Sequence, residues 1–219
     1  MENRKFVFVS DFDGTLTNRD FYQMIIDDYL GEEGYNLFNE WKENKYKDRD
    51  FLNEIYDSIN RDEKEILKDV LRIEWVNSAD GVIENIQDAG GEFIILSAGT
   101  SYYIEKFLIG KGLSKIKVYS NLGEDKNKGI HLKVDENKPY YSDVYGIDKG
   151  KVISYLKEKY PYVYYVGDSL SDIISCKVAD ECFAKGALQQ MLRDEKVEFI
   201  PINSFKDIEE YLIDKGVIE

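Results

Sequence analysis

The sequence predicts an α/β fold in three layers, with helices on both faces of a mostly parallel sheet. After residue 78, short apolar runs of strand character alternate with segments of helical periodicity. A second observation is a purely helical stretch over residues 21–73, placed directly after the first strand-like run. In sheets of this kind, ligands bind beyond the carboxyl ends of the strands. The residues that follow each predicted strand are therefore the candidates for function.

The first strand and the helical stretch divide the chain into two predicted domains. Residues 5–10 form a β-rich run that stops at a cluster of Asp and Gly residues. From Phe21 to Ile73 the apolar residues follow helical spacing, and nothing there resembles a strand. We expect a core domain of residues 1–16 and 78–219, and a helical cap domain of residues 17–77.

The second half of the chain supplies the rest of the core. The continuous apolar run 93–97 is typical of a strand covered on both faces, and Gly90 ends the helix before it. We expect a Rossmann-like parallel sheet of three layers, with a small all-helical cap inserted after the first strand. The remaining predicted elements are helices at 82–89, after Thr100, and at 151–159, 170–178 and 205–213, strands at 162–166 and 182–184, and a hairpin of strands 117–120 and 130–134 around a turn at 123–129.

Composition and charge exclude several classes of function. Apolar residues make up 43% of the 219 residues, enough for a sizeable core, while 43 acidic against 29 basic residues give a net charge of -14. Such a surface repels nucleic acid and anionic membranes, so we expect neither as a partner. No apolar run is long enough to span a bilayer, and the N-terminus lacks the apolar stretch of a secretory signal.

The cysteines and the histidine carry little chemistry. Cys176 and Cys182 have no metal-site or redox spacing, and we interpret them as reduced structural thiols, which favours a cytoplasmic location. The single histidine, His131, falls in the predicted hairpin, where an exposed or structural role is favoured over that of a base.

Two carboxylates follow the first strand. In extended backbone, Asp11 and Asp13 point to the same side. Carboxylates held this close repel each other unless one is protonated or a cation lies between them, and Mg²⁺ commonly uses one or two carboxylates together with a substrate phosphate. Gly14 lets the backbone turn out of the strand. An acidic turn without a ligand is the simpler alternative.

The second strand ends in small residues before a helix, at Ser97, Ala98, Gly99 and Thr100. Open backbone N–H groups beside a helix N-terminus favour an anion, and the Ser97 hydroxyl adds a donor for a phosphate oxygen. Taken alone, a plain turn with Thr100 as the N-cap explains this segment better.

The third strand ends at Asp168, where a metal ligand would lie, and Asp172 opens the next helix. Asp172 also completes a capping box with Ser169, and capping is compatible with support of a metal. Lys149 precedes a helix, where its charge opposes the dipole and so suggests another use.

These motifs, in this order, resemble the haloacid dehalogenase superfamily of phosphohydrolases, in its phosphoserine phosphatase-like branch. Residues 11–15 look like the first motif of that family, Ser97 like the second, Lys149 like the third and the segment 167–172 like the fourth. The helical insertion after the first motif is similar to the cap of that branch.

The resemblance implies a Mg²⁺-dependent phosphatase that acts through an aspartyl-phosphate. It makes Asp11 the nucleophile and Asp13 the general acid and base. The metal would be held by Asp11, by the backbone carbonyl of Asp13 and by Asp168, with Asp172 supporting these ligands from behind. Substrate would be bound by Ser97, Ala98, Gly99, Lys149 and Asp20. Phe21, Tyr22, Met24 and Asn53 are further cap positions whose contact with substrate the sequence does not decide.

The implied partner is a small phosphomonoester of a methionine-salvage or phosphoserine-like kind, acted on by a monomer or homodimer. Phosphoserine phosphatases carry a cap Arg near the position of Asn53, and its loss argues against phosphoserine. Two alternatives use the same motifs. One is a phosphotransferase or mutase, and the other is a catalytically silent protein that binds phosphate and metal.

Overall fold

The computed structural model describes residues 5–219, and its contacts divide the chain into two compact units. The first unit contains the chain up to residue 18, residues 75–96 and residues 149–219, and the second contains residues 19–74 and 97–148. The expectation that residues 1–4 belong to no secretory signal lies outside the described residues. No helix within residues 5–219 combines the length and the apolar character needed to cross a bilayer.

The first unit is built on parallel strands around β1 (Val7–Ser10). On one side β1 pairs in parallel with β2 (Glu92–Thr100), and on the other with β7 (Val163–Gly167). The parallel strands β8 (Glu181–Ala184) and β9 (Ile200–Pro201) continue the sheet beyond β7. Burial of all four β1 residues explains why this strand is continuously apolar.

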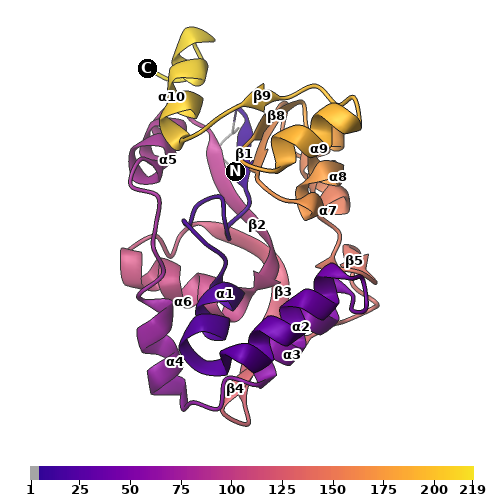
Figure 1. The fold of residues 1–219 in the computed structure, drawn as a ribbon. Coiled ribbons are helices and arrows are strands. Elements are labelled where there is room, and N and C mark those ends of the chain that lie inside the picture. Colours follow the sequence, from indigo (N-terminus) through magenta and orange to yellow (C-terminus); the bar gives the residue numbers. More distant parts are fainter. Residues whose placement is uncertain (1–4) are drawn as a thin grey trace. The chain divides into compact units, whose positions relative to one another are not determined.

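Helices cover both faces of these strands (Figure 1). The helices α5 (Ala79–Asp88) and α10 (Phe205–Asp214) pack together on one side. On the other side are α7 (Lys149–Lys157), the 3-10 turn η2 (Leu170–Asp172), α8 (Ile173–Val178) and α9 (Leu188–Asp194). The predicted three-layer fold is confirmed.

Alternation along the strands separates the two faces. Phe8 of β1 stacks against Phe93, Tyr164 and Phe183, each on a different strand, which makes one face aromatic. Tyr165, the next residue of β7, is buried on the opposite face. The two adjacent tyrosines therefore lie in different surroundings.

The second unit contains the helices predicted for residues 21–73. They are α1 (Phe21–Ile25), the π-helical turn η1 (Ile26–Leu30), α2 (Glu32–Lys42), α3 (Asp48–Asp57) and α4 (Glu63–Val70). The unit also contains the end of β2, α6 (Ser101–Lys111), β3 (Lys117–Lys126), β4 (Gly129–Lys133), β5 (Tyr141–Ser142) and β6 (Gly146–Ile147). Strand β2 contributes residues to both units, and the hydrogen-bonded strand order is β4-β3-β2-β1-β7-β8-β9.

Several boundaries differ from the prediction. Strand β2 continues to Thr100 rather than stopping at Ser97, and α7 begins at Lys149 itself. The predicted turn at 123–129 is largely strand, because β3 runs to Lys126 and the hairpin turns through only two residues. Helix α9 and strands β5, β6 and β9 were not predicted.

The interpretation of the cysteines as reduced thiols is wrong for this structure. Cys176 of α8 and Cys182 of β8 form a disulfide, with their Cα atoms 5.0 Å apart. The segment between them is a tight connection from helix to strand, and this return brings two residues six positions apart within bonding distance.

Candidate active site

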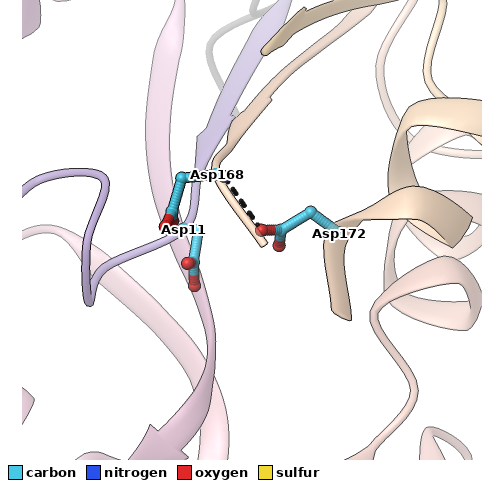
Figure 2. Close-up of side chains that lie close together, drawn as sticks. All are labelled: Asp11, Asp168 and Asp172. Atoms are coloured by element: carbon cyan, nitrogen blue, oxygen red, sulfur yellow. Dashed lines mark hydrogen bonds between the residues drawn. The ribbon is translucent and has the colours of Figure 1, made fainter. Parts of the chain in front are cut away.

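Three carboxylates meet where two neighbouring strands of the first unit end. Asp11 follows β1, Asp168 follows β7, and Asp172 ends the η2 turn. One oxygen of each lies within 4.8 Å of the other two, and Figure 2 shows the side chains converging. Pairing of Ser10 with Val166 places the two strand ends side by side, as the rule for parallel sheets requires.

The ammonium group of Lys149 joins two of these carboxylates. Its Nζ atom lies 2.8 Å from Asp11 Oδ1 and 2.6 Å from Asp172 Oδ1, and the side chain is only 2% exposed. Burial by itself lowers the pKa of Lys149, but the charges of Asp11 and Asp172 outweigh it and hold the pKa well above its ordinary value. Lys149 is therefore a buried cation.

Asp172 is surrounded by hydrogen-bond donors. Its Oδ1 atom accepts from Lys149 and from the Tyr165 hydroxyl, the latter at 2.6 Å. Its Oδ2 atom accepts from the backbone N–H groups of Asp168 (3.1 Å) and Ser169 (2.9 Å) and from the Ser169 hydroxyl (3.0 Å). The capping box predicted for Ser169 and Asp172 is confirmed.

These donors decide the charge of Asp172 and what it can do. Burial alone raises the pKa of its carboxyl, yet Lys149, Tyr165 and Ser169 together hold the pKa below the ordinary value. A carboxylate offers about four lone-pair sites, and donors take up all of them. Asp172 is thus suited to organising its neighbours rather than to touching a metal ion.

Asp11 shows the opposite balance. Burial raises the pKa of its carboxyl well above the ordinary value, the attraction of Lys149 opposes this, and the charges of Asp172 and Asp168 add to it. The Lys149 ammonium group pairs with Asp11 and Asp172, and Asp168 adds a third acidic side chain, so ionisation of all three would leave negative charge in excess. A divalent cation between Asp11 and Asp168 would offset that excess.

The loop after β1 is shaped around Asp168. Thr15 donates to Asp168 Oδ1 at 2.7 Å, and Lys185 donates to the Gly14 carbonyl at 2.9 Å. Gly14 has φ +74°, and a Cβ atom there would lie 2.5 Å from Asp168 Oδ2. Only glycine suits both the backbone conformation and the space.

Asp13 lies in the same loop and is half-buried. Among the described residues, the group of converging carboxylates contains Asp11, Asp168 and Asp172 but not the side chain of Asp13. The roles expected for Asp13 therefore remain a proposal.

The residues expected to bind phosphate belong to the second unit, apart from Lys149. Ser97 is buried, and its Oγ atom accepts from the Gly99 N–H at 2.9 Å. The Ala98 carbonyl accepts from the Asn121 side chain, which also donates to the Tyr145 carbonyl, both at 2.8 Å. The segment 97–99 is therefore held in an ordered conformation by hydrogen bonds of its own unit.

The cap positions differ in their surroundings. Asp20 occupies the N-cap position of α1 without a side-chain capping bond and is half-buried. Phe21 and Met24 are buried, and Phe21 stacks on Tyr103 at 4.5 Å. Tyr22 packs edge-on against Phe51. These contacts agree with a structural role for the apolar residues.

Asn53 and His131 connect α3 to the β3–β4 hairpin. Asn53 accepts from the Leu132 N–H at 3.0 Å and donates to Asp57 at 3.0 Å. The Nδ1 atom of His131 lies 3.1 Å from the Asp57 carboxylate. The structural role expected for His131 agrees with this contact, and the polar groups of Asn53 are engaged within the protein.

Sequence reasoning missed Tyr165, Lys185 and Asn121. Each acts through a single hydrogen-bonding group placed by tertiary structure, and none belongs to a motif. The one available signal was period two along β7, which puts Tyr165 on the same face as Gly167.

The comparisons with known proteins agree with this geometry. Residues 8–174 match the family model described as haloacid dehalogenase-like hydrolase. A 2-hydroxy-3-keto-5-methylthiopentenyl-1-phosphate phosphatase of Bacillus cereus (strain ATCC 10987 / NRS 248) is 25% identical over 210 residues, which cover 92% of this chain and 93% of that protein. A protein of the same name from Bacillus cereus (strain G9842) is 23% identical, with 92% and 93% covered.

Solved structures show the same fold. A phospho-aspartyl intermediate analogue of phosphoserine phosphatase superposes with a TM-score of 0.69 at 21% identity, covering 95% of this chain and 99% of that one. A haloacid dehalogenase family hydrolase from Salmonella enterica subsp. enterica serovar Typhi gives a TM-score of 0.73 at 16% identity, with 99% and 72% covered. The family model spans most of the chain and includes both strand ends that carry the carboxylates, and by this measure the chain belongs to the haloacid dehalogenase-like hydrolases.

Proposed function

We propose that the protein is a Mg²⁺-dependent phosphatase that hydrolyses a small phosphomonoester through an aspartyl-phosphate. The observation that carries this proposal is the buried Asp11, which lies at the end of β1 against Lys149 and beside Asp168. A carboxylate held next to a cation in a water-poor site is suited to attack an electrophilic phosphorus.

The donor set suits Mg²⁺, which prefers oxygen ligands and commonly takes one or two carboxylates. Asp11 and Asp168 are the carboxylates that would hold the ion, with the Asp13 backbone carbonyl as a third ligand and Asp172 behind them. When bound, the ion offsets the repulsion between Asp11 and the phosphate and stabilises the transferring group. The space kept open by Gly14 beside Asp168 supports this assignment.

The chain's own residues supply the remaining steps. An Asp11 oxygen forms a bond to phosphorus while the bond to the leaving oxygen breaks, and Asp13 gives that oxygen its proton. In the second step, Asp13 takes a proton from water, whose oxygen attacks phosphorus and releases Asp11 and inorganic phosphate. Lys149 neutralises charge next to Asp11 in both steps.

We assign phosphate binding to Lys149 and to the segment of Ser97, Ala98 and Gly99. The Ser97 hydroxyl and the backbone N–H groups, in the last residues of β2 before α6 begins, are suitable donors for phosphate oxygens. In the protein alone the Gly99 N–H donates to Ser97, so its use for phosphate requires this bond to be exchanged. Asp20 is the polar cap residue proposed to contact the leaving group.

We propose that residues 17–77 act as the cap and that residues 1–16 and 78–219 form the catalytic core. The four helices and the π-helical turn within residues 21–70 support the first part of this division. A cap of this kind would exclude water during the first step.

The names of the sequence relatives favour a methionine-salvage substrate over phosphoserine. They are phosphatases of 2-hydroxy-3-keto-5-methylthiopentenyl-1-phosphate. Asn53, near the position of the carboxylate-binding Arg, is a neutral side chain bonded to Leu132 and Asp57. A substrate without an amino-acid carboxylate agrees with both observations.

The test measures phosphate release with Mg²⁺ from a panel containing phosphoserine, phosphocholine and the methionine-salvage enol phosphate. Wild type is compared with Asp11→Asn and with the matched control Asp88→Asn, which changes an exposed residue of α5. We expect wild type and the control to release phosphate, and we expect the rate of phosphate release to fall at least a thousandfold in Asp11→Asn. Formation of a phosphorylated product in place of free phosphate would identify a phosphotransferase or mutase, and a folded wild type without turnover would identify a silent binder.

A further inference from the structure

We propose that Tyr165 is a positioning residue of the catalytic centre, which fixes the orientation of Asp172 and through it the place of Lys149. The inference rests on the proposed function and adds to it a residue outside the motifs. Tyr165 is fully buried in β7, and its hydroxyl donates to Asp172 Oδ1 at 2.6 Å.

The contacts of Asp172 fall into two groups. Its Oδ2 atom is held by the loop that follows β7, through Asp168 and Ser169. Its Oδ1 atom is shared by Lys149 and Tyr165. Tyr165 is therefore the contact that ties this second oxygen to a strand of the sheet.

A carboxylate held at one oxygen can still turn about its Cβ–Cγ bond, and holding the second oxygen removes this freedom. The place of Asp172 Oδ1 matters because Lys149 binds it at 2.6 Å and reaches Asp11 Oδ1 at 2.8 Å. A small rotation of the Asp172 carboxylate would change the position of the Lys149 ammonium group relative to Asp11. Displacements of this size are costly for catalysis, since reacting groups must be held to within a fraction of an ångström.

Packing alone gives no reason for a tyrosine at this position. A phenol buried without a partner costs free energy, and Tyr165 avoids this cost by a short bond to an ionised carboxylate. The neighbouring Tyr164 provides the contrast, because its ring packs against Phe8 and Phe183 on the aromatic face. The chain thus contains a matched pair of buried tyrosines, of which one contacts the catalytic cluster.

The first test compares Tyr165→Phe with Tyr164→Phe, using p-nitrophenyl phosphate as the probe and saturating Mg²⁺. We expect kcat to fall more than threefold in Tyr165→Phe while KM stays within twofold, and both constants of Tyr164→Phe to stay within twofold of wild type. A kcat of Tyr165→Phe within threefold of wild type overturns the proposal, and so does an equal loss in the control. A purely structural role would not separate kcat from KM.

The second test needs no activity. Urea denaturation midpoints are measured for wild type, Tyr165→Phe, Asp172→Asn and the double variant. If Tyr165 acts through Asp172, the fall in the urea midpoint caused by Tyr165→Phe is at least halved in the Asp172→Asn background. An undiminished fall in the midpoint overturns the proposal. If the wild type hydrolyses no ester, the phosphatase proposal fails, and this cycle alone decides the role of Tyr165.

Discussion

At the scale of single residues, the two carboxylates that bind Lys149 have pKa values shifted in opposite directions. Both are buried, yet the pKa of Asp172 is held low by its ring of donors, whereas burial raises that of Asp11. The difference follows from the number of donors each accepts and from the two acidic neighbours of Asp11. The protein's own donors stabilise the charged form of Asp172, whereas stabilising the charged form of Asp11 requires a further cation.

The first prediction concerns Asp11→Asn in the metal-free protein. A carboxyl whose pKa is raised on folding contributes stability below its unfolded pKa, about 3.9, and loses it as the pH rises through the folded pKa. Ionisation of Asp11 in the folded protein therefore costs stability. We expect Asp11→Asn to raise the urea midpoint in EDTA at pH 7.5, with a gain that shrinks as the pH is lowered toward about 4.

Added Mg²⁺ provides the control for this prediction. An ion that binds only the folded state at a hundred times its Kd adds about 2.7 kcal/mol. We expect a stabilisation of this order in wild type and a much smaller one in Asp11→Asn, which lacks a ligand. Equal stabilisation of both proteins would contradict the assignment of Asp11 to the metal.

The second prediction separates two effects of glycine. Gly14 and Gly112 have similar positive φ angles, +74° and +77°, but a Cβ atom meets Asp168 only at Gly14. Alanine at either site costs about 1 kcal/mol for the left-handed backbone. We expect Gly14→Ala to lower kcat more than tenfold because Asp168 is displaced, and Gly112→Ala to keep kcat within twofold. Phosphate-release kinetics and urea denaturation measure the two effects, and equal kcat values would refute the steric argument.

At the scale of elements, the β3–β4 hairpin shows that a polar segment whose sequence resembles a loop can form a strand. Its two-residue turn consists of Asn127 and Lys128, with φ +52° and +66°. Two consecutive positive φ angles characterise the type I′ turn, for which Asn-Gly is the preferred pair. The third prediction is that Lys128→Gly raises the free energy of unfolding by about 0.5 kcal/mol, since it relieves the left-handed strain.

Lys126→Gly is the matched variant for the hairpin, because it introduces the same residue two positions earlier in β3. There the backbone is extended, and glycine is expected to cost about 0.5–1 kcal/mol. Urea denaturation measures the free energy of unfolding of both variants. An equal decrease in both would show that the turn geometry does not limit stability.

Prediction from sequence succeeded for elements with strong periodicity and failed at their ends. The apolar runs of β1 and β7 and the helical insertion are defined by burial, which leaves a clear pattern. The segment 123–126 is polar because none of its residues is buried, the first two being half-buried and the last two exposed, so its composition resembles a loop. Its pairing depends on β4, and no local rule shows that partner.

At the scale of the whole molecule, the order of the motifs predicted the carboxylates at the strand ends, because the topology of a parallel sheet fixes where strand ends meet. The supporting contacts could not be predicted in this way. Tyr165 reaches Asp172, and Lys185 reaches Gly14, through side chains whose partners depend on packing. The disulfide was missed because the spacing of Cys176 and Cys182 has no meaning until α8 and β8 turn back on each other.

The net charge of -14 gives the fourth prediction, which concerns the approach of an anionic substrate. At low ionic strength the protein as a whole repels a phosphomonoester, while Lys149 attracts it only at short range. The Debye length falls from about 30 Å at 0.01 M to about 10 Å at 0.1 M, so salt screens the distant repulsion first. We expect kcat/KM for p-nitrophenyl phosphate to rise severalfold between about 0.01 M and 0.1 M NaCl. Under saturating Mg²⁺, kcat should stay nearly constant, because the chemical step occurs after the anionic substrate has bound. A fall in kcat/KM with salt would instead mean that the local cations dominate the approach.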